Sequence, residues 1–353
     1  MAMVRGRWAA LVVLASLIFA SCSGAAGSPT ASGTPGSTTS GTAAGSTPTP
    51  VRIGLDAFGG AVVVYVAQQQ GYFAKHGLQV TIQTYSVGLD TLNSVLAGTA
   101  DFGWAFDFGS LGAMASNQLR YVAVLTRTQP GFDQLAVRTD TVKTPADLQG
   151  KKMGITAGTQ QHYITVKYLQ NIGVPVSSVQ LINFGSPLEM VAALRTGQID
   201  GAWVYGQAVQ VAQSSKGIAL IASDGAVIKQ GLGLLIGSAS FVRQQPDATQ
   251  RLLSALIDAE NWLKQDPSNL QTAATYIAGQ LHAPVAGVLA NIKPAEQTVS
   301  LRQSDVTYLE QLATFRNQVA AGNPSASAPP LNVPQYIDAS PLRAVDPAAV
   351  SLP

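Results

Sequence analysis

The chain has 353 residues, of which 46% are hydrophobic and 11% are charged, and its formal net charge is +2. Without Arg5 and Arg7 near the N-terminus, 19 basic residues balance 19 acidic ones, which excludes the basic surface that nucleic acids or a polybasic membrane contact require. One cysteine and three scattered histidines exclude intrachain disulfides and offer no metal-ligand spacing, so we expect no metal and no cofactor.

The first residues have the pattern of an export signal. Arg5 and Arg7 precede an apolar run, Trp8 to Phe19, that is shorter than the ~20 residues needed to cross a bilayer. Small residues then lead directly into Cys22, as in a bacterial lipobox. We therefore expect residues 1–22 to be a lipoprotein signal peptide and Cys22 to carry a lipid. An ordinary signal peptide with an incidental cysteine is the alternative.

Residues 23–50 consist of Ser, Gly, Ala, Pro and Thr alone. Such a segment cannot bury apolar surface and is expected to be a disordered tether. We expect the chain beyond it to lie outside the cytoplasm, held by the lipid on the outer face of the cell membrane.

From residue 51 the sequence alternates β-rich and helical segments. In the first series we expect strands at 51–57, 78–85, 101–105 and 121–126, and helices at 61–70, 89–97 and 108–116. In the second series we expect strands at 152–157, 179–184, 201–204 and 218–222, and helices at 159–171, 187–196 and 206–213. A β-rich run at 232–242 and helices at 247–264, 270–281 and 305–320 follow. This alternation predicts parallel sheets with helices on both faces and a ligand site beyond the carboxyl ends of the strands.

The two series share one motif. Gly98–Trp104 and Gly197–Trp203 both read G-x-x-D-x-x-W, and each follows a predicted helix and opens a predicted strand. The glycines can end the helices in the left-handed conformation, and the tryptophans lie toward the strand ends. The repeat predicts two similar α/β lobes that face each other across a cleft. A chance match is the alternative for the repeat, and core packing is the alternative role for Trp203.

The sequence has no nucleophile elbow, Walker loop, zinc-protease motif or CxxC pair, and we expect no catalytic residue. Gly59-Gly60 forms a turn between a strand and a helix. The segment Thr159-Gln160-Gln161-His162 opens a helix and can offer hydroxyl, amide and backbone donors to an anion. A plain N-cap is the alternative for Thr159.

Three carboxylates follow or end predicted strands and can pair with a cationic group: Asp56, Asp107 and Asp133. We expect Asp107 to be the one that meets a ligand ammonium. The remaining candidate ligand-binding residues supply walls and hydrogen bonds: Phe58, Gly59, Trp104, Phe108, Trp203, Tyr205 and Gln207.

Four segments resemble the solute-binding proteins of the nitrate/sulfonate/taurine transport family. They are 70–78 (QGYFAKHGL), 96–103 (LAGTADFG), 143–152 (KTPADLQGKK) and 197–203 (GQIDGAW). Within the family the chain is most similar to taurine-binding proteins, which carry T-T-H-Y where this chain has Gln160-Gln161-His162-Tyr163. The resemblance covers residues 51–341.

The resemblance implies an α/β fold of the periplasmic-binding-protein type II, or Venus flytrap, in which two lobes are joined by two crossing segments. We place the crossings near 133–139 and 231–240, the first lobe at 51–135 plus 240–353 and the second at 136–239. It also implies a monomeric extracytoplasmic protein without enzyme activity, which binds taurine or a related sulfonate and delivers it to the permease and ATPase of an ABC importer.

Other ligands and roles remain open at this point. Nitrate, an amine-free alkanesulfonate or a thiamine-precursor-like amine can replace taurine. The chain can also be a sensor that presents its closed form to a receptor. Enzymes that make the thiamine pyrimidine share the fold, but they carry a cysteine-rich motif that this chain lacks.

Overall fold

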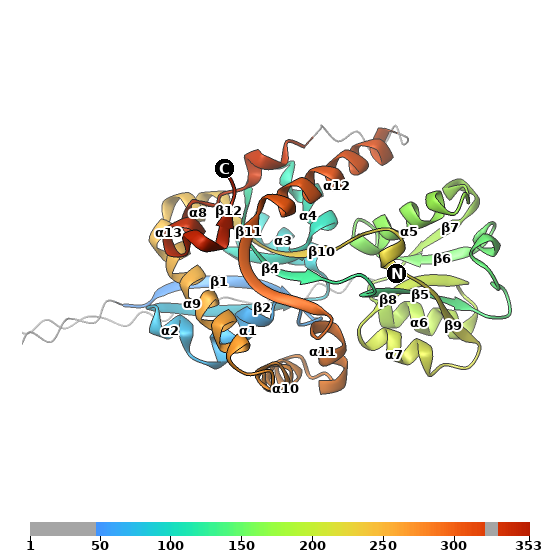
Figure 1. Ribbon diagram of the computed structural model, residues 1–353, viewed down its shortest axis with the longest axis horizontal. Helices are drawn as coiled ribbons and strands as arrows, with labels where there is room; N and C mark the ends of the chain where they lie inside the picture. The colour runs from blue at the N-terminus through green and yellow to red at the C-terminus, as the bar shows by residue number, and fades with distance from the viewer. Residues whose placement is uncertain (1–46, 322–330) are drawn as a thin grey trace, which may run out of the picture. The chain divides into compact units, whose positions relative to one another are not determined.

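Two β-sheets organise the computed structural model, which describes residues 47–321 and 331–353. Figure 1 shows the larger sheet on one side and the smaller one on the other. The predicted signal peptide, Cys22 and most of the tether lie outside the described residues.

The larger sheet has seven strands in the order β12-β11-β4-β10-β3-β1-β2. Its strands are β1 (Thr49–Asp56), β2 (Leu78–Tyr85), β3 (Phe102–Phe106), β4 (Leu119–Thr128), β10 (Gly231–Ser238), β11 (Ala295–Arg302) and β12 (Val350–Ser351). The helices of this part are α1 (Val62–Gln69), α2 (Tyr72–Lys75), α3 (Gly88–Leu96), α4 (Asp107–Met114), α8 (Ala239–Gln244), α9 (Pro246–Gln265), α10 (Asn269–Leu281), α11 (Val285–Ile292), α12 (Gln303–Ala321) and α13 (Ser340–Val345).

The smaller sheet has five strands in the order β7-β6-β8-β5-β9. They are β5 (Asp133–Arg138), β6 (Lys152–Ile155), β7 (Gln180–Asn183), β8 (Gly201–Tyr205) and β9 (Ile218–Ser223), with helices α5 (Gln160–Asn171), α6 (Pro187–Thr196) and α7 (Gln207–Gln213). The predicted two-lobed α/β fold is therefore confirmed.

The sheets are mixed rather than parallel, which corrects the sequence-based expectation. Strands β1, β2 and β3 pair in parallel, but β10 pairs antiparallel with both β3 and β4. In the smaller sheet β5 pairs antiparallel with β8 and β9. Both β5 and β10 enter their sheet directly from the other lobe, so no crossover helix turns them into the parallel direction.

The observed strands also correct the expected positions of the two crossing segments. The runs 133–139 and 231–240, expected as crossings, are mostly strands β5 and β10. The chain passes between the sheets at 129–132 and at 224–230. We infer a first lobe that contains residues 47–128 and β10 onward, and a second lobe of about residues 133–223.

The shared G-x-x-D-x-x-W motif has a structural role in both lobes. Gly98 and Gly197 end α3 and α6 with positive φ angles of 72° and 77°. Asp101 then accepts the backbone N–H of Arg52 at 2.8 Å, and Asp200 accepts that of Lys152 at 3.0 Å. Each aspartate thus ties its segment to the neighbouring parallel strand, to β1 at Arg52 or to the start of β6 at Lys152.

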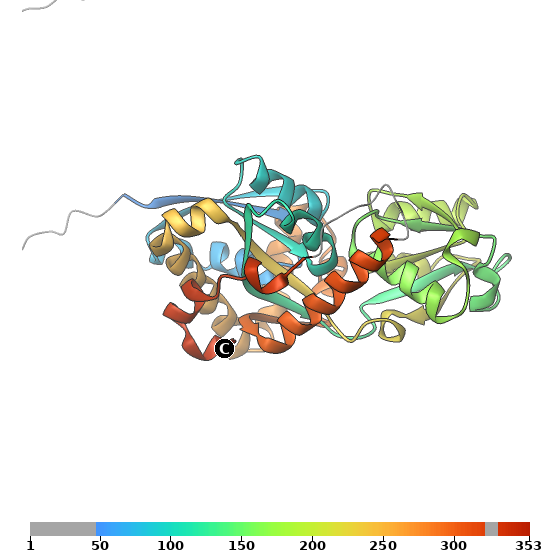
Figure 2. The ribbon, with the colours of Figure 1, turned by 90° about the horizontal axis from the view of Figure 1, so that it is seen from above.

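Helix α12 and strand β11 are held by a buried ion pair. Arg127 on β4 donates through Nε and Nη2 to the carboxylate of Asp305, at 3.1 and 2.6 Å, and its Nη2 also reaches Ser300. From this anchored start α12 runs toward the second lobe (Figure 2), where Phe315 meets Tyr163 edge-on with ring centroids 4.7 Å apart.

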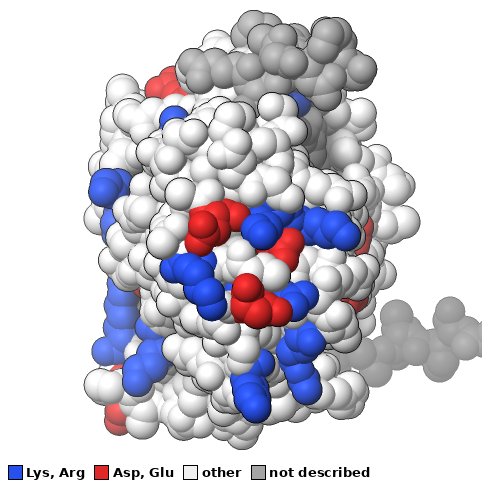
Figure 3. Space-filling view, turned by 90° about the vertical axis from the view of Figure 1, so that its right-hand side faces the viewer, with Lys and Arg blue, Asp and Glu red and all other residues white. Residues whose placement is uncertain are grey.

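Positive and negative side chains are interspersed on the outer end of the second lobe (Figure 3). This face therefore presents no basic field for nucleic acid, in line with the charge balance of the sequence. Among the described helices, none combines the length and the apolar character that a membrane span requires.

We predict that Asp305→Ala lowers the free energy of unfolding by about 3 kcal/mol, because it leaves the buried Arg127 guanidinium with only the more distant carboxylate of Glu296, whose Oε2 lies 3.7 Å from Nη1. The side chains of Arg127 and Asp305 are only 4% and 1% exposed. Chemical denaturation measures the change. Asp247→Ala is the matched control, since Asp247 pairs with Arg251 at 80% exposure and should cost less than about 1 kcal/mol. Equal losses in the two variants would contradict the assignment.

Candidate functional site

A small buried cavity of about 40 Å³ lies between the two lobes. Its first-lobe lining comes from the carboxyl ends of β1 and β3 and the start of α3: Asp56, Phe58, Val87, Gly88, Leu89, Ala105, Phe106 and Gly109. Its second-lobe lining comes from the start of α5, the start of α6 and the end of β8: Thr156, Thr159, Gln160, Gln161, Pro187 and Tyr205. We call this space the inner cavity.

A wider space of about 380 Å³ adjoins it, which we call the outer cleft. Phe58, Pro187 and Tyr205 line both spaces, so the two are neighbours. The rings of Phe58 and Tyr205 meet edge-on with centroids 5.2 Å apart. This aromatic pair, one ring from each lobe, therefore forms the border between the inner cavity and the outer cleft.

Two helices begin at the inner cavity without a side-chain cap. Helix α3 starts at Gly88 after an extended Val87, and α5 starts at Gln160 after an extended Thr159, and neither N-cap side chain accepts a backbone N–H. Their first-turn amides, together with the positive ends of the helix dipoles, favour an anion at this point. The two helices belong to different lobes, so an anion at this point would contact both lobes.

Thr159 occupies the N-cap position of α5, but its side chain caps no backbone N–H, so the alternative of a plain N-cap does not hold. The Thr159 hydroxyl donates to the Thr156 carbonyl at 2.7 Å and contacts Gln161 Oε1 at 3.0 Å. His162 Nδ1 instead accepts the N–H of Gly158 at 3.2 Å. Burial lowers the pKa of His162, which keeps the ring neutral and able to accept this bond.

The side chain of Gln160 is 2% exposed, and neither its Oε1 nor its Nε2 has a hydrogen-bond partner among the described residues. A buried carboxamide without partners is costly, on the order of 1–3 kcal/mol. Because Gln160 lines the inner cavity, a polar ligand there can satisfy both atoms.

Asp56 supplies the carboxylate of the inner cavity. Its Oδ1 accepts the N–H of Phe58 at 3.1 Å, and the residue is 4% exposed. Burial raises the pKa of Asp56 to about 7, and the Phe58 amide opposes this only in part. None of the described residues that line the cavity is Lys or Arg, so no protein cation balances this carboxylate.

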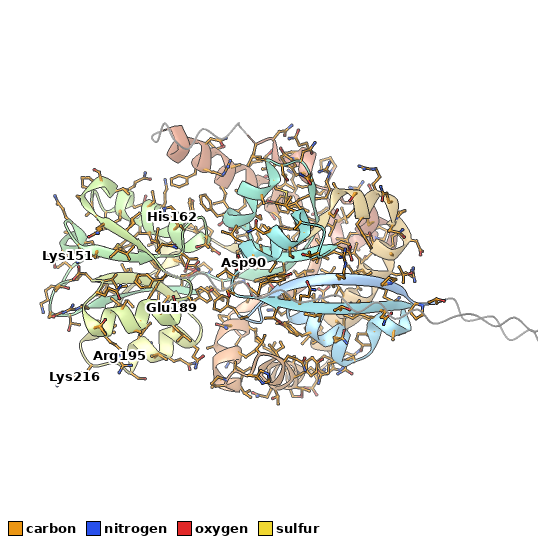
Figure 4. The ribbon with its side chains drawn as sticks, turned by 180° about the vertical axis from the view of Figure 1, so that it is seen from behind. Asp90, Lys151, His162, Glu189, Arg195 and Lys216 are labelled. Atoms are coloured by element: carbon orange, nitrogen blue, oxygen red, sulfur yellow. The ribbon has the colours of Figure 1, made fainter. Side chains whose placement is uncertain are left out.

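Three basic side chains of the second lobe lie away from the junction between the lobes. Figure 4 shows Lys151, Arg195 and Lys216 on the outer side of this lobe, whereas Asp90, His162 and Glu189 lie near the junction. Lys167 on α5 lies at the contact between the lobes, with its Nζ 5.3 Å from the centre of the Phe315 ring, but it does not line the inner cavity.

Asp107, the carboxylate expected to meet a ligand ammonium, has a different environment. It is fully buried and does not line the inner cavity. Its Oδ1 accepts the N–H of Phe108 at 2.6 Å and its Oδ2 accepts that of Leu232 at 2.7 Å. Both oxygens are thus used to join the start of α4 to β10, although burial still raises the pKa of Asp107 to about 7.

Asp133 lies at the crossing segments behind the cavity. Its Oδ1 accepts from Gln161 Nε2 at 3.0 Å, its Oδ2 has no partner among the described residues, and it is fully buried. Asp224, on the second crossing, accepts the N–H groups of Gly131 and Asp133. Burial, and secondly the nearby Asp224, raises the pKa of Asp133 to about 8.

The other predicted site residues are structural or line the outer cleft. Trp104 and Trp203 are core residues, 1% and 0% exposed, so the core alternative holds for Trp203 and applies to Trp104 as well. Phe108 stacks on Tyr163 across the lobes, with centroids 5.0 Å apart. Gly59 forms a turn with φ of 73°, and Gln207 lines the outer cleft.

Sequence reasoning missed the start of α3 and the whole contribution of α11. Val87 and Gly88 give little sequence signal, because nothing in them marks a ligand contact rather than a helix start. Asn291 on α11 donates from Nδ2 to the Phe58 carbonyl at 2.9 Å, and its side chain lies against Gly206 of the second lobe. Asn291 is 233 residues from Phe58 in the chain, which hides this contact from any local pattern.

A model of the family described as NMT1/THI5 like matches residues 61–270. A protein of Brucella abortus, named for binding without a stated ligand, is 28% identical over 244 residues, which are 64% of this chain and 75% of that one. The taurine-binding periplasmic protein of Escherichia coli is 26% identical over 254 residues, 67% of this chain and 77% of that one.

Among solved structures, the periplasmic aliphatic sulphonate binding protein SsuA of Escherichia coli has a TM-score of 0.68 at 18% identity. The match covers 82% of this chain and 97% of that one. This similarity shows that the chain has the fold of periplasmic binding proteins.

We predict that Gly206→Ala displaces the Asn291 side chain and breaks its hydrogen bond to the Phe58 carbonyl, which lowers the free energy of unfolding by about 1 kcal/mol more than in the control. Gly206 has φ 54° and ψ −128°, and an added Cβ would overlap Asn291 Oδ1. Chemical denaturation measures the change. Gly217→Ala is the matched control, because Gly217 also has a positive φ, 81°, but open space around the missing Cβ. The same loss in Gly217→Ala would count against the role of this contact.

Proposed function

Since the chain belongs to the NMT1/THI5-like family and has the periplasmic-binding-protein fold, we propose that it is the solute-binding protein of an ABC importer. It acts by binding a small molecule between its lobes and presenting it to a permease, without chemical turnover. The observation that carries this proposal is the inner cavity, which both lobes line and in which buried polar groups have no protein partner. Such an arrangement favours the state in which the lobes meet around a ligand.

The charges of the inner cavity are matched best by a small zwitterion, and we propose taurine or a close amino sulfonate, which would bind as the space of about 40 Å³ widens. The uncapped first turns of α3 and α5, with the Gln160 carboxamide, are suited to a sulfonate. Asp56 is suited to an ammonium, and its pKa near 7 would fall once a cation adjoins it. The taurine-binding relative from Escherichia coli supports this assignment.

Nitrate and amine-free sulfonates fit less well. Either anion would leave the Asp56 carboxyl buried beside it without a cation, so binding would require Asp56 to take up a proton. An amine without an anionic group would satisfy Asp56 but leave the helix amides unused. Of these ligands, only a zwitterion would provide an anion for the helix starts and a cation for Asp56.

We further propose that the protein works outside the cytoplasm as a monomer, attached by a lipid on Cys22 and a flexible tether. The export-type sequence before residue 22 and the small-residue segment after it support this placement. The taurine-binding relative from Escherichia coli is a periplasmic protein, which supports an extracytoplasmic site.

Asp56→Asn should weaken taurine binding by roughly 100-fold or more, because a buried ammonium loses its carboxylate. Ethanesulfonate, which has no amine, should bind the variant as well as or better than the unchanged protein. Isothermal titration calorimetry measures both, with nitrate as a third ligand. Asp140→Asn is the control, since Asp140 is an exposed carboxylate that pairs with Arg138 and does not line the cavity. Tight nitrate or ethanesulfonate binding without a response to taurine would overturn the zwitterion assignment.

Taurine affinity should rise with pH up to about 7 and then level off. The free protein holds a proton on Asp56 below its pKa of about 7, and the ammonium requires the ionised form. The dissociation constant should therefore increase up to about tenfold per unit below that value. Calorimetry at pH 6 in two buffers of different ionisation enthalpy should show proton release, which Asp56→Asn should abolish. A flat pH profile in the unchanged protein would count against this carboxyl.

Cys22→Ala should move the full-length protein from the membrane fraction to the soluble one, because the lipid has no other attachment point among the residues of this single-cysteine chain. Fractionation followed by immunoblotting measures the distribution. Ser23→Ala, one residue further on, is the control. An unchanged membrane fraction for Cys22→Ala would exclude lipid anchoring at this position.

A further inference from the structure

The outer cleft has an apolar character that taurine alone does not explain. Leu188, at the start of α6, is 44% exposed and is the one large hydrophobic side chain recorded as exposed among the described residues. It lines the outer cleft together with Ala57, Pro187, Ala208 and Val288. An exposed leucine beside a ligand cavity is suited to an apolar contact that the free protein lacks.

Three polar side chains of the outer cleft are engaged within the protein. The Glu189 carboxylate accepts the N–H of Gly185 at 2.9 Å, and the Ser186 hydroxyl accepts the N–H of Glu189 at 3.3 Å. Asn291 donates to the Phe58 carbonyl at 2.9 Å. Ser86, Tyr205 and Gln207 also line the space and form no side-chain hydrogen bond with the described residues. The outer cleft thus offers a ligand aliphatic and aromatic surface with a few polar groups beside it.

The position of the outer cleft selects one end of the ligand. Its lining includes Ala57 and Phe58, which directly follow Asp56, and none of the α5-start residues 156–161. A group that extends from the inner cavity into the outer cleft would pass the Phe58–Tyr205 border beside Asp56. The extension would thus leave from the ammonium end rather than from the sulfonate end.

We propose that the outer cleft is a subsite for an apolar substituent on the ligand nitrogen, and that the protein prefers N-alkylated amino sulfonates to taurine itself. The nitrogen must remain basic, because an amide would not carry the charge that Asp56 pairs with. This inference rests on the proposed function, since it takes the orientation of the ligand from Asp56 and the helix starts.

Calorimetry with the purified protein tests the proposal with taurine and N-cyclohexyltaurine, which share the head group and differ in the apolar substituent. N-cyclohexyltaurine should bind about tenfold more tightly or better, as expected for burial of several methylene groups. Leu188→Ser should remove much of this advantage, roughly three- to tenfold, and leave taurine affinity unchanged. Leu188→Met should retain it.

Val176→Ser is the matched control, because it removes a half-buried aliphatic side chain of the same lobe outside both spaces. If taurine binds and N-cyclohexyltaurine binds equally or more weakly, the subsite is overturned and the proposed function stays intact. The same conclusion follows if Leu188→Ser affects both ligands alike. If neither compound binds, the amino sulfonate assignment fails and the subsite falls with it.

Discussion

The geometry of the cleft depends on how the two crossing segments are tied together. The Asp224 carboxylate on the second crossing accepts backbone N–H groups of Gly131 and Asp133 on the first. Asp133 in turn accepts from Gln161 at the start of α5. A helix end that faces the inner cavity is thereby connected to the point about which the lobes can move. A ligand that engages the start of α5 acts directly on this connection, and the same contacts keep a buried carboxylate cluster in place.

The electrostatics of the cavity is the basis for proposing a ligand with two charges. The uncapped starts of α3 and α5 favour negative charge, whereas the buried Asp56 favours positive charge, and no described Lys or Arg lines the space. Burial of the helix starts, or of the Asp56 carboxylate, is unfavourable as long as no opposite charge lies beside them. Because the helix starts come from different lobes, a bound zwitterion would compensate both ends only when the lobes are together. Binding and the lobe arrangement are then the same event.

The aromatic residues divide this part of the molecule into three regions with different roles. Trp104 and Trp203 fill the cores of the two sheets, so their sequence repeat reflects common construction rather than a common ligand. Phe108, Tyr163 and Phe315 join α4, α5 and α12 across the lobes. Phe58 and Tyr205 alone of these stand at the border of the inner cavity and the outer cleft. The position of each ring, rather than its residue type, therefore distinguishes the rings that pack from those that can contact a ligand.

The sequence by itself determined the α/β alternation, most strand and helix positions, the family and the start of α5 as part of the site, because these depend on periodicity, glycine positions and local motifs. It did not determine which carboxylate faces the cleft. Asp56 and Asp107 both end or follow a buried strand, and nothing local distinguishes them. Only the tertiary structure decides, since Asp107 is engaged by the Leu232 N–H from a strand 125 residues later, whereas Asp56 retains its place in the cavity. The antiparallel pairing of β10 and the contact of α11 with Gly206 could not be predicted for the same reason. Both join segments that are far apart in the sequence, and no local sequence pattern indicates that such segments are in contact.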